Sequence, residues 1–205
     1  FMKPTILTVD KTQWINASGR IIIPGDNQSN NLVDKIVKSS VQLETKFKVF
    51  TGLQAYEKGK GTPKQTAKDV TNRIYDYDFK FDHDTYKYLN GSDTSRYNIN
   101  WSKTFLRWGP WLSQPRSLEI FKRPRVLVRE ITGKYPKCLF SVFTDKLYLN
   151  NKSIINILHE DDNVTELLFL QALLNSNLMS FFYKNNAVKS SRKLFPKIVI
   201  RNLRE

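Results

Sequence analysis

The sequence predicts an α+β fold, with an irregular, mainly antiparallel sheet and one long C-terminal helix packed on it. Strand-like segments rich in β-branched residues dominate the 205 residues, and helical segments lie between them. Only one segment, Val164–Tyr183, has the apolar spacing of a long helix. Hydrophobic residues make up 40% of the chain, which is enough for one good core or for one core plus a small lobe. The 13% aromatic content argues against disorder.

The N-terminal part of the chain predicts strands and one short helix. Leu32, Val33, Ile36 and Val37 have the spacing of an amphipathic helix, which we expect over Asn30–Ser39. Short apolar and β-branched runs predict strands at Met2–Val9, Arg20–Ile23 and Phe47–Phe50.

The central part of the chain predicts three further strands. Arg125–Ile131 is filled with β-branched residues, and Leu139–Phe143 and Lys146–Leu149 are separated by Thr-Asp, as in a hairpin. A short helix is expected over Ser117–Phe121, ending before a proline. We interpret Asn150–His159 as irregular or as a weak helix.

The long helix over Val164–Tyr183 has the clearest local signals. Asn163 can cap it, and Glu166 follows three residues later, as in a capping box. After the helix, Lys197–Leu203 predicts a last strand without a closing turn, so we expect a domain excised from a longer polypeptide. The apolar stripe of the helix should face the core, and it consists of Leu167, Leu170, Leu174, Leu178 and Phe181.

The charge of the chain indicates a polyanionic partner. Lys and Arg number 33 against 19 Asp and Glu, a net charge of +14. This excess favours nucleic acid over a membrane surface, because no basic amphipathic helix has a clean apolar face. Cys138 is the only cysteine, so no internal disulfide can form, and we expect a cytoplasmic location.

Motifs for catalysis or cofactor binding are absent from the sequence. It contains neither G-x-G-x-x-G nor G-x-x-x-x-G-K-[ST]. The segments Phe81–Asp84 and His159–Asp162 lack the second histidine of a helical zinc pair. Glu130 and Lys134 do not have the spacing of a metal-dependent nuclease. We therefore expect no catalytic residue and no metal site in this chain.

Basic residues gather in three clusters that predict contacts to phosphate. The first surrounds the loop Thr51–Gly61, where Gly59 and Gly61 would allow close approach of a ligand. The second, Arg96–Lys137, contains several tryptophans, and the third is Lys184–Lys197. Simple solvation of such loops is the alternative. We expect one concave DNA-binding face made of Lys58, Lys60, Lys64, Lys68, Arg107, Arg116, Lys189, Arg192 and Lys193.

Five motifs in a fixed order resemble a known family. They are FKVFTGLQAYEKGKG, LNGSDTSRYNI, FKRPRVLVREI, LQALLNSNLMSFFY and FPKIVIRNL. In this order they are similar to the TaqI-like C-terminal specificity domain of adenine-specific DNA methyltransferases and type IIG restriction–modification enzymes. The family's G-x-D-x-x-R-Y turn is matched by Gly91, Asp93, Arg96 and Tyr97. We interpret Asp93 and Arg96 as bracing this turn and Tyr97 as a core residue.

The resemblance implies a target recognition domain over residues 43–205, preceded by a lead-in segment, residues 1–42, that joins a methyltransferase core. Its partners would be double-stranded DNA and the methyltransferase or nuclease domains of the same polypeptide, which flip out and methylate an adenine or cleave the DNA. The family's Asn-Pro-Pro-Tyr/Phe tetrapeptide and glycine-rich S-adenosylmethionine loop are absent. S-adenosylmethionine and magnesium are therefore expected only in the parent protein, and no cofactor in this chain.

Two other functions stay open at this point. A metal-dependent nuclease could use carboxylates among Asp76–Asp84 together with Glu130. A docking module could hold other subunits without touching nucleic acid, and an exposed apolar patch would favour it.

Overall fold

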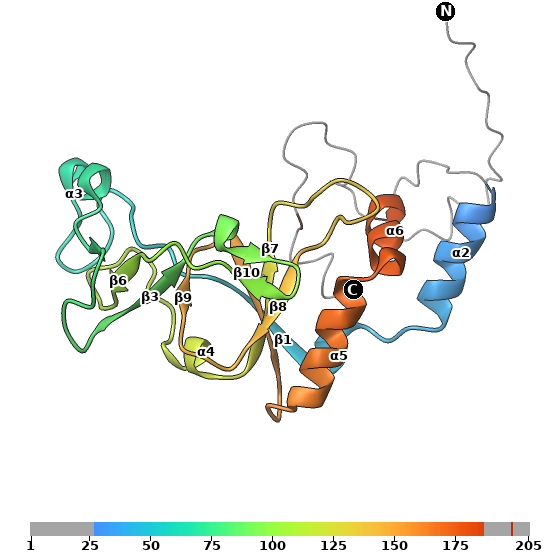
Figure 1. The fold of residues 1–205 in the computed structure, drawn as a ribbon. Coiled ribbons are helices and arrows are strands. Elements are labelled where there is room, and N and C mark those ends of the chain that lie inside the picture. The colour runs from blue at the N-terminus through green and yellow to red at the C-terminus, as the bar shows by residue number, and fades with distance from the viewer. Residues whose placement is uncertain (1–26, 187–197, 199–205) are drawn as a thin grey trace, which may run out of the picture.

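The computed structural model describes residues 27–186 and residue 198, and they form an α+β fold, as predicted (Figure 1). Apart from Ile198, the predicted strands Met2–Val9, Arg20–Ile23 and Lys197–Leu203 lie outside these residues. None of the helices in the described part of the chain has the length and apolar character needed to cross a membrane.

The first sheet has four antiparallel strands in the order β1-β10-β7-β8. They are β1 (Phe47–Thr51), β10 (Ile154–His159), β7 (Arg125–Arg129) and β8 (Ser141–Thr144). The strands predicted from β-branched residues at β1 and β7 are confirmed.

The position of β10 corrects the interpretation of Asn150–His159 as irregular or helical. All six residues of Ile154–His159 are buried, and the strand pairs with β1 on one side and β7 on the other. A strand buried on both faces lacks the alternation of polar and apolar residues that reveals strands in a sequence. Strand β7 is also interior, but it was predicted from its β-branched residues. In β10 the polar Asn156 and His159 interrupt the apolar run, so this strand gave no clear local signal.

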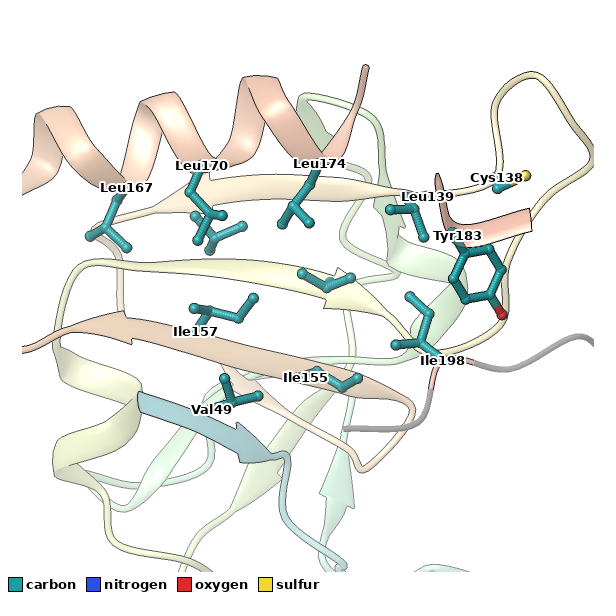
Figure 2. Packing of buried hydrophobic residues seen from close by; sticks show 12 residues of the cluster. Val49, Cys138, Leu139, Ile155, Ile157, Leu167, Leu170, Leu174, Tyr183 and Ile198 are labelled. Atoms are coloured by element: carbon teal, nitrogen blue, oxygen red, sulfur yellow. The ribbon is translucent and has the colours of Figure 1, made fainter. Parts of the chain in front are cut away.

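Helix α5 (Val164–Leu174) covers one face of the first sheet. Its Leu167, Leu170 and Leu174 point toward the strands, where they meet β-branched residues such as Ile157 (Figure 2). The predicted cap is confirmed, because the side chain of Asn163 accepts a hydrogen bond from the backbone N–H of Glu166 at 3.2 Å.

The predicted single helix Val164–Tyr183 is in fact two helices, because the chain turns at Asn175 before α6 (Asn177–Asn186). Asn175 is fully buried, and its side chain exchanges two hydrogen bonds of 2.9 Å with the backbone of Ser141 in β8. This side chain takes the place of a strand partner for β8. Leu178, which was expected to face the core, lies beyond the turn and is exposed.

The second sheet is smaller and has the order β2-β6-β3-β9, with β3 and β9 parallel. Its strands are β2 (Asp76–Tyr77), β6 (Phe105–Arg107), β3 (Thr85–Leu89) and β9 (Leu149–Asn150). A separate antiparallel pair consists of β4 (Thr94–Ser95) and β5 (Asn98–Ile99). We call the first sheet with α5 and α6 the helix lobe, and the second sheet with its loops the loop lobe.

Five other helices lie in the described residues. They are α2 (Asn27–Lys38), α3 (Ala67–Asn72), α4 (Glu119–Lys122) and the 3-10 helices η1 (Leu43–Thr45) and η2 (Gly91–Asp93). Helix α2 confirms the amphipathic helix expected in this region, and α4 overlaps the short helix expected before β7.

Gly52 marks the point where the chain passes from the first sheet to the second. Its N–H donates to the carbonyl oxygen of Ile154 at 3.1 Å, and the N–H of Leu53 donates to that of Asn150 at 2.9 Å. A Cβ atom at Gly52 would overlap the carbonyl oxygen of Asn151, so only glycine allows this approach. The loop lobe then has its own hydrophobic core, which consists of Leu53, Ala55, Tyr88, Leu106, Leu112, Phe121 and Leu149.

Arg125 joins the two lobes from the start of β7, where its side chain is fully buried. Burial lowers its pKa to about 10, so the guanidinium is still charged at neutral pH. The guanidinium donates five hydrogen bonds of 2.7 to 3.3 Å to neutral oxygens, namely the carbonyl oxygens of Phe121, Arg123, Lys146 and Tyr148 and Oδ1 of Asn156.

These bonds explain why the predicted hairpin of Leu139–Phe143 with Lys146–Leu149 is wrong. Strand β8 lies in the first sheet and β9 in the second, and the two do not pair. The carbonyl oxygens of Lys146 and Tyr148, in the connection between the strands, both accept from Arg125. The hydrogen bonds to Arg125 therefore hold this connection against the loop lobe, and it does not form the tight turn of a hairpin.

Replacing Arg125 by lysine should lower the free energy of unfolding by about 3 kcal/mol, because an ammonium group leaves buried carbonyl oxygens unpaired. Urea unfolding followed by circular dichroism measures this loss. The matched control is Arg129→Lys on the same strand, where the guanidinium lies 5.2 Å from the ring of Phe140 and is partly exposed. The control should lose less than about 1 kcal/mol, and equal losses would contradict the prediction.

Candidate nucleic-acid interface

The segment Glu57–Gln65, here called the lysine loop, is held in one conformation by the buried side chain of Gln65. Its Nε2 donates to the carbonyl oxygens of Ala55 and Trp111, both at 2.8 Å, and its Oε1 accepts from the N–H of Glu57 at 2.9 Å. The N–H of Gly59 donates to the carbonyl oxygen of Gln65 at 2.9 Å and closes the loop. The loop is therefore ordered by hydrogen bonds within the protein.

The lysine loop packs on the turn Trp108–Trp111. The N–H of Thr62 donates to the carbonyl oxygen of Pro110 at 2.8 Å. Gly61 has a φ of 83° and lies so close to the carbonyl oxygen of Trp111 that a Cβ would overlap it. Gly61 thus serves the packing of two protein loops, whereas Gly59, with a φ of 79°, faces open space where a ligand has room.

Lys58, Lys60 and Lys64 project from the lysine loop and are exposed, as is Lys68 in α3. In residues 27–186, no hydrogen bond or ion pair holds the ammonium groups of the three loop lysines. An ammonium group without a carboxylate partner can neutralise a phosphate without first breaking an ion pair.

Arg107 is already engaged within the protein. Its Nε donates to Oδ2 of Asp82 at 2.6 Å, and its guanidinium lies over the rings of Trp111, at 4.6 Å, and Phe81, at 5.6 Å. The hydroxyl of Thr85 and then Arg107 hold the pKa of Asp82 below its usual value. A contact of Arg107 with DNA would compete with this ion pair.

A stack of aromatic rings supports the lysine loop. The rings of Tyr56 and Tyr75 are nearly parallel with centroids 5.9 Å apart, and Tyr75 lies 6.0 Å from Trp111. The guanidinium of Arg73 lies 5.0 Å over Tyr56. Burial, and then the carboxylate of Asp76 that accepts its hydrogen bond, raise the pKa of the Tyr56 hydroxyl. Trp111 is half-buried in this stack.

Arg116 lies where the loop lobe meets the helix lobe. It is exposed, and its Nη2 donates to Oγ1 of Thr51 at the end of β1, at 2.7 Å. Its φ of 57° places it in the left-handed region, which non-glycine residues rarely occupy. The structure therefore holds this cation at the surface at the boundary between the two sheets.

The loop lobe brings together predicted site residues from the first two basic clusters. Two other lysines of the first cluster, Lys46 and Lys48, lie on the helix lobe instead, in ion pairs with Glu166 and Glu160. Lys189, Arg192 and Lys193 lie outside the described residues, so the single concave face stays a prediction. The predicted residues in the loop lobe are Lys58, Lys60, Lys64, Lys68, Arg107 and Arg116.

Sequence reasoning missed Gln114 and Lys152, which lie beside this boundary. The backbone of Gln114 exchanges two hydrogen bonds with that of Gln54, at 2.8 and 3.0 Å. The Nζ of Lys152 donates to Oε1 of Gln54 at 3.4 Å. No local pattern reveals this proximity, because the contacts join segments far apart in the sequence.

The G-x-D-x-x-R-Y turn is a structural brace, as expected. Asp93 is buried and accepts from the N–H of Asn90 at 2.8 Å, and Arg96 donates to the carbonyl oxygen of Asn175 between α5 and α6. The expectation that Tyr97 belongs to the core is wrong, because its side chain is 55% exposed. Its φ of 64° and the bond of its N–H to β8 turn the side chain outward.

No group of three His, Cys, Asp or Glu residues that could hold a metal ion occurs in the part of the chain that the structure describes. Asp82 is held by Arg107. The buried His159 has its Nε2 3.3 Å from Oε2 of Glu166. In Phe81–Asp84 and in His159–Asp162, Asp82 and His159 therefore contact other protein side chains.

Most of the chain matches one known family. The model of the TaqI-like C-terminal specificity domain matches residues 86–205, more than half of the chain. The chain belongs to this family. A search of curated proteins gave no match.

In this specificity domain, the matched residues begin at Tyr86 in β3 and include Arg107 and Arg116. The lysine loop and β1 precede them. Strand β1 nevertheless pairs with β10 along its whole length, from Phe47 opposite His159 to Thr51. The folded unit therefore extends N-terminally beyond the matched residues.

Replacing Asp82 by asparagine should make the stability of the specificity domain less sensitive to acid. The folded-state pKa of Asp82 is depressed, so its contribution is present above the unfolded pKa of about 3.9 and is lost as the pH falls through the folded value. Urea midpoints measured from pH ~6 to ~2 should decline less steeply for Asp82→Asn than for the wild type.

The control for this experiment is Asp78→Asn, an exposed position on the same connection between β2 and β3. The control should follow the wild-type pH dependence. An unchanged slope for Asp82→Asn would show that its bonds to Thr85 and Arg107 do not contribute to stability.

Proposed function

We propose that this specificity domain recognises a short target in double-stranded DNA. It would position the target for an adenine-specific methyltransferase domain of the same polypeptide, which acts alone or is fused to an endonuclease. Membership of the TaqI-like specificity family supports this role. The main structural observation in its favour is the lysine loop. Its lysines are exposed, and hydrogen bonds of Gln65 hold its backbone in place. The chain as a whole has a net charge of +14.

The order of the lysine loop matters for binding energy. Hydrogen bonds of Gln65 and Thr62 already fix its backbone, so binding DNA need not order it again. Lysine ammonium groups neutralise phosphates without reading sequence, and they hold a protein in register on the duplex. The lysine loop is therefore suited to non-specific affinity.

In this proposal the chemistry lies in other domains of a cytoplasmic parent protein. The methyltransferase domain would hold S-adenosylmethionine, and a nuclease domain, where present, would hold magnesium. The sequence has no glycine-rich loop for S-adenosylmethionine and no Asn-Pro-Pro-Tyr/Phe. Among residues 27–186, no group of three His, Cys, Asp or Glu side chains could hold a magnesium ion. The contribution of this chain is recognition.

The outer face of α5 is suited to contact such an attached domain. Val164, Leu168 and Phe169 are 42%, 46% and 69% exposed on the side of the helix that does not pack on the sheet. This apolar face is small, but a covalent link gives a high effective concentration, so a weak contact suffices. We propose that the methyltransferase domain covers it.

The triple variant Lys58→Ala, Lys60→Ala, Lys64→Ala should weaken DNA binding and reduce its salt dependence. A wild type with ~6 phosphate contacts should lose about 1000-fold in affinity between ~50 and ~200 mM salt. Removing three contacts should reduce the slope of log affinity against log salt by about 2.7. A gel-shift titration with a non-specific duplex at several salt concentrations measures both values.

The matched control removes the same charge from lysines that already have carboxylate partners. Lys46, Lys48 and Lys122 pair with Glu166, Glu160 and Glu119, and their triple alanine variant should keep most of the wild-type slope. If the slope of log affinity against log salt falls equally in the two triple variants, net charge alone drives binding and the lysine loop is not the contact surface.

A further inference from the structure

The segment from Gln114 to Arg116 is fixed at three consecutive residues. The backbone of Gln114 exchanges hydrogen bonds with Gln54, and the carbonyl oxygen of Pro115 accepts from Nε1 of Trp108 at 3.1 Å. The side chain of Arg116 donates to Thr51 of the other lobe. A segment held at this many points presents its free polar groups in a defined position.

The side-chain amide of Gln114 is exposed and has no hydrogen-bond partner among the described residues. The amide of Gln54, directly opposite, is occupied, because its Nε2 donates to Glu57 at 2.9 Å and its Oε1 accepts from Lys152. Opposite residues of an antiparallel pair project to the same side. The side chain of Gln54 therefore lies beside that of Gln114. Because the Gln54 amide already bonds to Glu57 and Lys152, it does not occupy the Gln114 amide, which can bond to a ligand.

Arg116 differs from the other arginines of this region. Arg107 and Arg123 pair with Asp82 and Asp162 at 2.6 and 2.8 Å, whereas Arg116 bonds only to a hydroxyl and has no carboxylate partner in the described chain. A guanidinium has five N–H donors, so most of those on Arg116 are available. Its left-handed backbone is a type of strain that concentrates at functional sites.

We infer that Gln114 and Arg116 read base edges in the major groove, while the lysine loop contacts phosphates. This inference rests on the proposed function and adds the residues that supply sequence preference. A glutamine amide pairs with N6 and N7 of adenine, and a guanidinium pairs with O6 and N7 of guanine. The Cα atoms of residues two apart lie at most ~7 Å from each other, so the two bases should lie within about two base pairs of each other.

Selection from a randomised duplex library, with the 205-residue chain as bait, tests the inference. The wild type should enrich a motif that contains an adenine and a guanine at this separation. Gln114→Ala should lose preference at the adenine and Arg116→Ala at the guanine, each by roughly 10- to 100-fold in discrimination. Both side chains are exposed, and thermal unfolding verifies that the variants are folded.

A conservative substitution makes the test more specific. Gln114→Glu replaces the amide by a group that only accepts hydrogen bonds, which suits the N4 amino group of cytosine. This variant should change the preferred base at the same position from adenine to cytosine. A general loss of folding or affinity would not produce such an exchange.

Two control variants separate base reading from other effects. Lys103→Ala removes an exposed cation that also has a left-handed backbone, with a φ of 63°, and Gln42→Ala removes an exposed glutamine on the helix-lobe side. Both should enrich the wild-type motif. An unchanged motif with the Gln114 and Arg116 variants, or a wild type that binds duplex without enriching any motif, would overturn the inference. A wild type without salt-dependent binding to any duplex would overturn the proposed function instead.

Discussion

The buried guanidinium of Arg125 is the interaction on which the arrangement of the two lobes depends. A buried charge is tolerated only when its donors are satisfied. Here five neutral oxygens converge on the guanidinium, from α4, from Arg123 just after it, from β10 and from the connection after β8. These oxygens belong to segments that would otherwise be free to separate. The need to satisfy one cation therefore fixes where the loop lobe lies relative to the first sheet, and with it the position of β9.

The positive charges of the chain divide into two groups with different roles. Lys46, Arg107 and Arg123 pair with carboxylates and connect neighbouring elements. The lysines of the lysine loop and Arg116 lack such partners in the described chain and lie on the loop lobe. Because 33 basic residues face only 19 acidic ones, some cations must stay unpaired. Three of these cations, Lys58, Lys60 and Lys64, lie on a loop that packs on the turn Trp108–Trp111.

Elements with strong local signals were predicted correctly, and those shaped by distant contacts were not. The β-branched run of β7 and the cap at Asn163 depend on neighbours in sequence, so they could be predicted. The break at Asn175 depends on β8, and the strand β10 is buried on both faces. In the candidate site, charge pointed to the lysine loop and Arg116, but nothing local distinguished Gln114 from other exposed glutamines.

The sequence by itself determined the excess of cations, the absence of catalytic and cofactor motifs, and the ordered motifs of the specificity family. Net charge is a count over the whole chain, and motifs are runs of neighbouring residues. Both can be recognised without knowing which distant residues are in contact in the fold. Only the tertiary structure decided that Arg107 is paired with a carboxylate, whereas Arg116 has no carboxylate partner among the described residues and bonds to the hydroxyl of Thr51. The partner of Arg107, Asp82, lies 25 residues away in sequence and is brought to Arg107 by the pairing of β6 with β2 and β3. The attraction between two charges weakens as they move apart, so a cation is paired only where the fold brings a carboxylate close to it. The fold, and not the composition, therefore decides which cations are available to a ligand.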